Sequence, residues 1–454
     1  MKVFGSSGVR GLANDEVTPT FAMRVARAAG TAWGAKRVAV GRDTRTTGGM
    51  LADAVASGLA SVGAAVDRVG IVPTPGLQAY AEREGVPAVM VTASHNPPAY
   101  NGLKLIGADG IELARADLDG IEELLDGREF ARADWDAVGE SRRVEGVRRA
   151  YVDDLLGAVD RERIADAAPT VALDPGHGAG ALTSPGFFRR LGCEVVTVNA
   201  QPDGHFPGRD PEPVAPNLGD LRRLVRASDA DLGIAHDGDG DRAIFVDERG
   251  EDVEGDAALA ALAAAELGPG DATVSAVNVS QRLVDVVREA GATLELTPIG
   301  STNIISRIRE LRTEGANVPI AGEGNGGIFF PNYRLARDGA YTAARFLELV
   351  AERPTSEVVA PYGGYHNVRE NLDYGSAAQR EAMLSAIARA AEAADADLDR
   401  TDGYRLDYGD AWVLARPSGT EPLIRVYAEA RDPDRAERLV DRMVAAAEEA
   451  TADA

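Results

Sequence analysis

Ser94 and His95 are the residues of this chain whose types and setting best suit group-transfer chemistry. They follow an apolar run, residues 86–91, that predicts a buried strand. Prolines at positions 97 and 98 forbid a helix, so we expect Ser94 on a tight loop at the end of that strand. Open α/β sheets bind ligands at such strand ends. An isolated Ser-His pair would fit an ordinary polar loop, so a catalytic role depends on what other loops supply.

An aspartate loop, residues 236–242, supplies the first of these partners. Asp237, Asp239 and Asp241 alternate with other residues between two expected strands, 231–235 and 243–246. Three carboxylates can converge only around a positive charge, and hard oxygen ligands suit Mg²⁺. The loop therefore predicts a magnesium site with these three ligands.

Two alternatives for the aspartate loop fit less well. A calcium EF-hand would place Glu248 at its twelfth position, but Arg242 stands at the sixth, where glycine is needed, and the flanks are strands rather than helices. A phosphatase with an aspartate nucleophile also uses a strand followed by Asp-x-Asp. That interpretation would leave the Ser94 loop without a role.

Two further loops carry groups that suit a sugar phosphate. A glycine loop, residues 322–327, follows an expected strand at 318–321, and its Glu323 and Asn325 can bind vicinal hydroxyls. An arginine loop, residues 416–425, lies between two expected strands, and guanidinium forks, hydroxyls and turn amides together match a phosphate. Its candidate phosphate-binding residues are Arg416, Ser418, Gly419, Thr420 and Arg425.

Two single basic residues add to this set. Arg10 lies in a glycine- and serine-rich stretch, residues 4–11, whose backbone could wrap an anion. Lys104 is one of three lysines, whereas 45 of the 48 basic residues are arginine. Lysine can release a proton when its pKa is lowered and arginine cannot, so Lys104 is a candidate for proton transfer.

The elements that must position these loops alternate between strand and helix through three blocks, which indicates mostly parallel sheets with outer helices. The third block is expected to include a helix at 335–350. The last block changes to an α+β pattern with a closing helix near 433–450. We therefore expect four regions around one cleft, namely residues 1–145, 146–252, 253–355 and 356–454.

Composition limits the function classes further. The chain has 454 residues, a net charge of −24 and a single cysteine, Cys193. The charge disfavours nucleic acid and membrane partners, while the single cysteine excludes an intrachain disulfide and favours the cytoplasm. No apolar run reaches the roughly 18 residues that a transmembrane helix needs. A surface this acidic and poor in lysine also predicts adaptation to high salt.

At the serine loop, residues 91–102, and at the aspartate, glycine and arginine loops the chain resembles the α-D-phosphohexomutases, the family of phosphoglucomutases, phosphomannomutases and phosphoglucosamine mutases. The resemblance covers essentially the whole chain and implies three similar mixed-sheet α/β domains plus a C-terminal α+β domain. It implies that Ser94 carries the transferable phosphate and is a further ligand of one Mg²⁺ at the three aspartates. It also implies that Lys104 helps to move the hydroxyl proton, whereas we expect His95 to bind hydrogen-bond partners rather than act as the base.

The resulting functional expectation is a phosphohexomutase that interconverts hexose 1- and 6-phosphates through a bound hexose 1,6-bisphosphate. Arg10 and Arg242 would lie near the transferred group, and the arginine loop would bind the other phosphate. A sugar-phosphate phosphatase and a non-enzymatic binding module stay open as alternatives. The sequence indicates no obligate protein partner.

Two local features of the sequence bear on the preferred hexose. The segment 96–102 resembles the phosphoglucomutase/phosphomannomutase branch more than the bacterial glucosamine branch. Gly327 departs from the family pattern, because bacterial members usually have a histidine there. Phosphoglucosamine mutase therefore remains the alternative activity.

Overall fold

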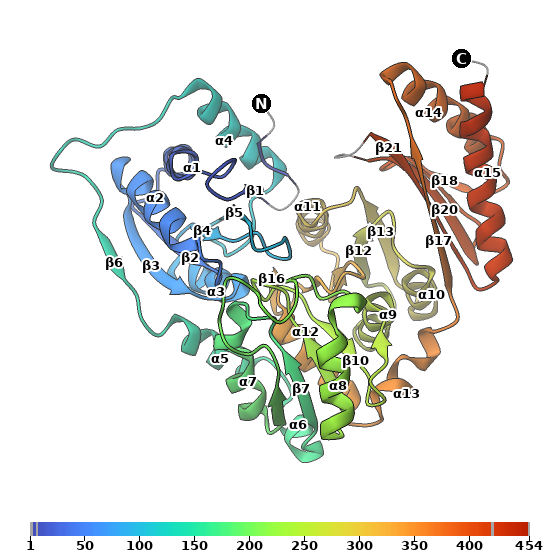
Figure 1. The fold of residues 1–454 in the computed structure, drawn as a ribbon, viewed down its shortest axis with the longest axis horizontal. Coiled ribbons are helices and arrows are strands. Elements are labelled where there is room, and N and C mark those ends of the chain that lie inside the picture. The colour runs from blue at the N-terminus through green and yellow to red at the C-terminus, as the bar shows by residue number, and fades with distance from the viewer. Residues whose placement is uncertain (1–2, 6–7, 419–421, 453–454) are drawn as a thin grey trace.

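A computed structural model describes residues 3–5, 8–418 and 422–452. The chain forms four regions in an arc, from the N-terminal region through two central ones to the C-terminal region (Figure 1). The first two combine helices with mixed sheets, the third combines helices with a parallel pair and a small antiparallel sheet, and the last is an antiparallel sheet covered by helices. The expected fold class is therefore confirmed.

The first region is built on a six-stranded sheet in the order β1-β5-β4-β2-β3-β6. Strands β2, β3, β4 and β6 are parallel, while β5 is antiparallel to both of its neighbours. The strands are β1 Val9–Leu12, β2 Arg37–Arg42, β3 Ala65–Ile71, β4 Ala88–Val91, β5 Tyr100–Ile106 and β6 Ser141–Arg143. The helices are α1 Pro19–Trp33, α2 Gly48–Ser61, α3 Thr74–Glu84 and α4 Arg115–Gly127.

Local sequence explains how α1 begins and ends. Thr18 accepts a hydrogen bond from the Phe21 amide, and Pro19 occupies the first helical position, where its missing N–H is not needed. Gly34 ends the helix in the left-handed conformation that glycine adopts without a steric penalty. The helix buries its alanine-rich face on the first sheet.

The second region has a five-stranded sheet in the order β11-β10-β9-β7-β8. Its strands are β7 Thr170–Asp174, β8 Glu194–Thr197, β9 Leu232–Ala235, β10 Ile244–Val246 and β11 Asp252–Val253. Its helices are α5 Val147–Gly157, α6 Arg161–Ala167, α7 Ser184–Leu191 and α8 Gly219–Ser228. The aspartate loop joins β9 to β10, as the sequence predicts.

The third region divides its strands between a parallel pair, β12 Ala272–Ala276 with β13 Thr293–Thr297, and a three-stranded antiparallel sheet. That sheet consists of β14 Ala321–Gly322, β15 Ile328–Phe330 and β16 Arg334–Arg337. Its helices are α9 Gly255–Glu266, α10 Gln281–Ala290, α11 Ser301–Thr313, α12 Gly339–Val350 and α13 Thr355–Val359.

Two sequence predictions in this region are wrong. The expected strand at 318–321 reduces to β14, which pairs only at positions 321 and 322. The helix predicted for 335–350 begins at Gly339, because residues 334–337 pair with β15 and Asp338 caps the helix by accepting from the Tyr341 amide at 3.0 Å. An apolar run that changes from strand to helix cannot be divided by periodicity alone.

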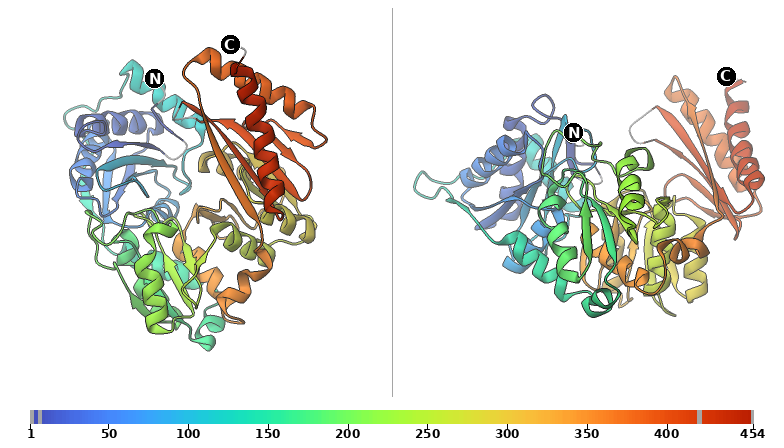
Figure 2. Two further views of the ribbon diagram at one scale, coloured as in Figure 1. Left: turned by 45° about the vertical axis from the view of Figure 1, so that its right-hand side comes forward. Right: turned by 60° about the horizontal axis from the view of Figure 1, so that its bottom comes forward.

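The fourth region is an antiparallel sheet in the order β17-β21-β20-β19-β18. Its strands are β17 His366–Asp373, β18 Asp397–Asp399, β19 Tyr404–Asp407, β20 Ala411–Pro417 and β21 Leu423–Ala430. Helices α14 Ala377–Glu392 and α15 Pro433–Ala452 lie together on one face of this sheet (Figure 2).

The hydrophobic cores show how the regions join. One cluster runs continuously through the second and third regions, which therefore pack as a unit, while the first and fourth regions each have their own core. Trp412 and Leu414 of the fourth region pack with Val277 of the third. Within the described residues, no helix combines the length and apolar character that crossing a membrane requires.

Candidate active site

Ser94 meets the aspartate loop across the interface between the first and second regions. Its Oγ donates a hydrogen bond to Asp237 Oδ2 at 2.6 Å, and both residues are buried. Ser94 has a φ of 51°, a conformation that is uncommon for a residue with a side chain. The loop thus brings the expected nucleophile against the expected metal ligands.

Arg45 supports the serine loop through hydrogen bonds to its backbone. Its guanidinium is fully buried and is paired with Asp43, whose Oδ2 also accepts from Thr92 Oγ1 at 2.6 Å. Thr92 Oγ1 in turn accepts from the Ser94 amide at 2.8 Å. Arg45 donates to the carbonyls of Ser94 at 2.8 Å, Asn96 at 2.6 Å, Pro97 at 2.7 Å and Tyr100 at 2.9 Å.

The three aspartates converge as the sequence predicts. Asp237, Asp239 and Asp241 are buried and offer oxygens that lie within 4.8 Å of one another. Other groups hold the second oxygens: Lys104 Nζ donates to Asp239 Oδ2 at 2.9 Å and to Asp241 Oδ2 at 2.8 Å. Arg337 also donates to Asp241 Oδ2, at 2.7 Å.

The remaining oxygens of this cluster fit a metal ion. Among the described residues, Asp239 Oδ1 and Asp241 Oδ1 are buried without a hydrogen-bond partner. A buried carboxylate oxygen without a partner is costly, so such atoms indicate a ligand that the protein itself does not provide. The chemistry of the donor set, three carboxylates, matches Mg²⁺.

The aspartates differ in how their charges are compensated. Burial, together with Asp241 and Asp239, raises the pKa of Asp237 well above its usual value. Burial also acts to raise the pKa of Asp241, but Arg337 and Lys104 outweigh it and hold that pKa well below its usual value. Burial and Asp241 act to raise the pKa of Asp239, but Lys104 and the hydrogen bond from Thr74 outweigh them and hold that pKa below its usual value.

Lys104 is held as a cation in this arrangement. Burial acts to lower its pKa, but Asp239, Asp241 and Glu112 together raise it above its usual value. The sequence argument for proton transfer required a lowered pKa. A proton could leave Lys104 only after its contacts with these carboxylates change.

His95 accepts a hydrogen bond from an arginine beside the serine loop. Burial, then Arg242 and Arg10, lower the pKa of His95 to about 2. Its Nδ1 accepts from Arg242 Nη2 at 2.9 Å and lies 3.4 Å from Ser94 Oγ. Arg10 Nη1 donates to Asn96 Oδ1 at 3.0 Å, so both arginines are fixed beside the serine loop.

A pocket of about 440 Å³ opens onto this centre. It brings together residues of the first three regions, among them Arg10, His95, Arg242, Glu323, Asn325 and Arg337. The glycine loop is ordered by Asn325, whose Oδ1 accepts from the Gly327 amide at 3.0 Å. The expected hydroxyl-binding residues therefore face the same space as the serine loop.

The surroundings of position 327 explain why a glycine is found there. A Cβ at this position would lie 2.8 Å from Arg337 Cδ and 3.0 Å from Asn325 Oδ1. A side chain there would require a shift of Arg337, which contacts Asp241, and of Asn325. The position that departs from the family pattern therefore lies directly beside Arg337, an arginine without a clear signal in the sequence.

The arginine loop stands apart from this pocket. Arg416 and Arg425 lie opposite each other on β20 and β21, and Arg416 pairs with Asp402 at 3.0 Å. No residue of the fourth region is among the described residues that line the pocket. Ser418 is described, whereas Gly419 and Thr420 lie outside the described residues.

Several site residues gave no clear signal in the sequence. Glu112 lies 3.8 Å from Lys104 Nζ, and Thr74 Oγ1 donates to Asp239 Oδ2 at 2.5 Å. Both come from ordinary-looking positions in the first region. The pair Asp43 and Arg45 had a weak signal, an Asp-x-Arg sequence directly after a strand.

The proline-rich segment 202–213 connects the two halves of the centre. Phe206 places its ring 5.2 Å from the Arg45 guanidinium, and Gly204 forms a β-bridge with Arg45. Arg209 donates to the His236 carbonyl at 2.6 Å and to Asp174 Oδ2 at 2.8 Å. The segment therefore contacts the support of the serine loop at one end and the aspartate loop at the other.

Family models match the chain in four consecutive parts. They are described as Phosphoglucomutase/phosphomannomutase, alpha/beta/alpha domains I, II and III, and the C-terminal domain of the same group. The matched residues are 1–132, 149–250, 254–363 and 374–446.

Individual relatives span the full length of the chain. A phosphoglucomutase/phosphomannomutase of Thermococcus kodakarensis is 40% identical over 99% of both chains. A probable phosphoglucosamine mutase of Methanopyrus kandleri is 42% identical over 98% of this chain and 97% of its own. A solved family protein of Burkholderia thailandensis superposes with a TM-score of 0.86 at 28% identity, covering 99% of this chain and 97% of that one.

Proposed function

The chain belongs to the phosphoglucomutase/phosphomannomutase family, and from this premise we propose that Ser94 is the residue that carries the transferred phosphoryl group. Members of this family are phosphohexomutases, isomerases that move a phosphate within a sugar. The observation that carries the proposal is the 2.6 Å contact between Ser94 Oγ and Asp237, inside a cluster of three carboxylates.

The step itself is an exchange of one P–O bond for another. The bond between phosphorus and Ser94 Oγ breaks while a bond forms to the free 1- or 6-hydroxyl of a hexose monophosphate. The proton of that hydroxyl ends on Ser94 Oγ, and the product is a bound hexose 1,6-bisphosphate. The bisphosphate turns around and returns its other phosphate to Ser94, which completes the isomerisation.

Asp237, Asp239 and Asp241 would hold one Mg²⁺. The ion would neutralise charge on the phosphoryl oxygens when bound. Lys104 and Arg337 orient two of these carboxylates by binding their second oxygens.

Other side chains would bind and orient the sugar phosphate. Arg242 and Arg10 lie beside the serine loop, and a guanidinium matches phosphate oxygens in a two-pronged contact. Glu323 and Asn325 would bind sugar hydroxyls from the facing wall of the pocket. The arginine loop, with Arg416, Ser418, Gly419, Thr420 and Arg425, would bind the phosphate that is not being transferred.

The substrate we propose is a glucose or mannose phosphate, with glucosamine phosphate as the second candidate. Relatives of similar identity carry names of both kinds. A coupled assay with the 1-phosphates of glucose, mannose and glucosamine separates the candidates. The one with the highest kcat/KM identifies the substrate.

Asp239→Asn tests the metal centre, because it removes one ligand charge from a site built on three. Turnover should fall far more than the free energy of unfolding, and added Mg²⁺ should recover part of it. Full activity of the wild-type protein after EDTA treatment would contradict the metal role. Release of inorganic phosphate as fast as isomerisation would instead favour a sugar-phosphate phosphatase.

The working environment we propose is a cytoplasm of high salt. It rests on the charge of −24, the single cysteine, and the three lysines among 48 basic residues. Repulsion among so many carboxylates destabilises a compact state unless salt screens it. Activity and thermal stability should therefore rise with salt concentration, and full stability in dilute buffer would contradict the proposal.

A further inference from the structure

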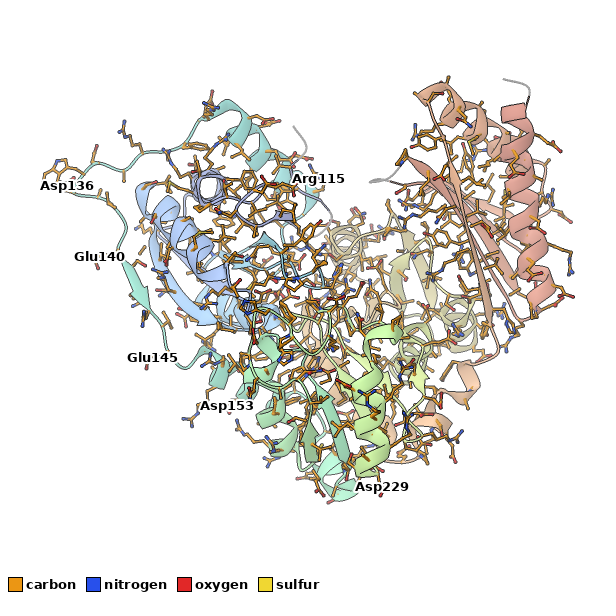
Figure 3. The ribbon with its side chains drawn as sticks, viewed as in Figure 1. Arg115, Asp136, Glu140, Glu145, Asp153 and Asp229 are labelled. Carbon is orange, nitrogen blue, oxygen red and sulfur yellow. The ribbon has the colours of Figure 1, made fainter. Side chains whose placement is uncertain are left out.

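A loop of the first region carries a tryptophan into solvent. This projecting loop, residues 128–140, links α4 to the edge strand β6 on the outer side of the molecule (Figure 1). Trp135 is 90% exposed and Val138 51% exposed. Figure 3 shows Asp136 at the outer tip of the loop, away from the rest of the chain. Large exposed apolar side chains that project in this way are typical of protein–protein contacts.

The projecting loop is fixed by hydrogen bonds of its backbone. Its amides and carbonyls bind the end of α2 and the start of β3, and a turn closes its tip. The bonds join Ala133 N to Ser61 O at 3.1 Å, Gly139 N to Ala60 O at 3.0 Å, Val66 N to Glu140 O at 2.7 Å, and Ala137 N to Asp134 O at 3.0 Å. A Cβ at Gly139 would lie 1.9 Å from Ala64 O, so the close approach requires glycine. These contacts therefore hold the loop in a conformation that leaves Trp135 exposed.

The same region contains a hollow of about 930 Å³, which includes none of the active-site residues described above. It lies between β2, β3, α2 and the segment 143–149 that follows β6. Its floor is aliphatic, with Val40, Ala52, Val69 and Val147 buried beneath it. Its charged lining is Arg42, Arg68, Arg143, Arg148 and Arg149 against Asp53 and Glu145. We refer to it as the arginine hollow.

The projecting loop and the arginine hollow are complementary. The tip places Trp135 between two carboxylates, Asp134 and Asp136. An aliphatic floor suits an indole ring, and a rim of guanidinium groups suits the flanking carboxylates. A positive hollow is also unusual in a chain whose net charge is −24.

The position of β6 explains how one copy could fill the hollow of another. β6 is the edge strand of the first sheet; the projecting loop precedes it and the rim of the hollow follows it. In two copies placed antiparallel along this edge, the loop of each lies beside the hollow of the other. β6 covers only Ser141–Arg143, so with Arg142 at the two-fold axis Ser141 of one copy faces Arg143 of the other, and the loop and the hollow flank this short pairing. Arg142 itself is paired with Asp67 at 2.6 Å, which reduces repulsion at the axis.

We propose that this face is a homodimer interface, in which Trp135 of each copy enters the arginine hollow of the other. The contact is isologous and closes with two copies, because both complementary surfaces lie on the same edge of one chain. Pairing of β6 with its counterpart would also cover an open sheet edge. The active-site pocket uses other residues, so each copy keeps a complete centre.

The first test is the oligomeric state by analytical ultracentrifugation at low and high salt. Wild-type protein should sediment as a dimer, and Trp135→Ala should raise the dissociation constant by at least about 100-fold, as for a central anchor residue. Because the side chain is exposed, thermal unfolding of the monomer should not change. Val214→Ala, an exposed apolar residue in another region, is the matched control and should remain dimeric.

Charge exchange gives the sharper test. Asp134→Arg/Asp136→Arg sets a positive loop against a hollow of net positive charge, and Arg148→Asp/Arg149→Asp gives the hollow an excess of carboxylates against an acidic loop, so each double variant alone should be monomeric. An equimolar mixture restores both contacts, and native mass spectrometry should show the mixed dimer only.

Three results would overturn the proposal. Wild-type protein could be a monomer at micromolar concentrations, or a dimer that none of these variants weakens. A monomer that binds inorganic phosphate, and loses that binding in Arg148→Asp/Arg149→Asp, would assign the hollow to a small anion instead.

Discussion

Two buried arginines support the two halves of the reaction centre, and they do so to different extents. Arg45 donates to four backbone carbonyls of the serine loop, whereas Arg209 donates to one carbonyl of the aspartate loop, that of His236. Each arginine is itself paired with a buried aspartate, Asp43 in one case and Asp174 in the other.

The difference follows from how each loop satisfies its own backbone. In the aspartate loop, Asp237 Oδ1 accepts from the amides of Asp241 and Arg242, and its carbonyl accepts from the Gly240 amide. In the serine loop, four carbonyls instead accept from the guanidinium of Arg45. The carbonyls of Gly238, Asp239 and Gly240 in the aspartate loop accept from backbone amides of three other segments. The aspartate loop therefore has many separate supports, whereas most of the outside support of the serine loop comes from one side chain.

The largest effect is expected for Arg45→Met, which keeps volume but removes the charge. It leaves Asp43 and the inward carbonyls unpaired in a buried site, at a cost of about 3–5 kcal/mol. Ser94 should shift as a result, and a misplacement of about 1 Å can reduce turnover roughly 100-fold. Urea unfolding and mutase kinetics measure both. A stable Arg45→Met protein with wild-type turnover would show that the serine loop orders itself.

Arg209→Met is the matched change on the other side. It also leaves the buried Asp174 without its ion-pair partner, so the free energy of unfolding should fall by a similar amount, about 3 kcal/mol. Turnover of the folded fraction should fall much less than in Arg45→Met, because the aspartate loop keeps its own hydrogen bonds. Equal losses of turnover in the two variants would contradict the comparison.

Phe206→Leu tests the connection between the two arginines. The change removes an aromatic face from the Arg45 guanidinium, a contact worth up to about 2 kcal/mol in a desolvated site. The free energy of unfolding should fall by that order, and KM should change less than kcat because the pocket is not touched. Phe206→Tyr, which retains the ring, is the control and should behave like wild type.

The smallest effect is a pH dependence from His236 in EDTA-treated protein. Burial lowers the pKa of His236 to about 4, below the usual value of about 6.5 in an unfolded chain. Between these values the unfolded chain binds a proton that the folded protein does not, so stability falls as the pH is lowered. The limiting slope is about 1.4 kcal/mol per pH unit, and His236→Gln should remove it. If denaturant titrations from neutral to acidic pH give the His236→Gln protein the same dependence of unfolding free energy on pH as wild type, the assignment is wrong.

Sequence reasoning identified the parts of the site that lie within single loops. Ser94 and the three aspartates follow strands directly, and open α/β sheets bind ligands at such strand ends, so each loop could be assigned to a site. The two strands, β4 and β9, belong to different sheets, so contact between the loops could be expected only from the arrangement of the regions around one cleft. The division into four regions was predictable for a similar reason, since alternation of strand and helix is a local pattern.

Residues that act across regions could not be found in this way. Arg337 reaches Asp241 from a strand that the sequence placed inside a helix, so its side chain was assigned to the wrong element. Lys104 was singled out, but its carboxylate neighbours come from two other segments, the aspartate loop and position 112, and they reverse the expected direction of its pKa shift. The charge balance of a buried centre depends on which side chains come into contact in the folded protein, and a local sequence pattern does not predict those contacts.

The central claim is that Ser94 carries the phosphoryl group, and one measurement tests it most directly. Wild-type protein is incubated with glucose 1,6-bisphosphate and examined by intact-mass and peptide analysis. Ser57→Ala, an exposed serine on α2, is the control for nonspecific modification. We predict a mass increase of one phosphoryl group, located in the peptide that contains Ser94 and absent from Ser94→Ala, which should also have no mutase activity. Unchanged mutase activity in Ser94→Ala, or phosphate on another residue in active protein, would contradict the account.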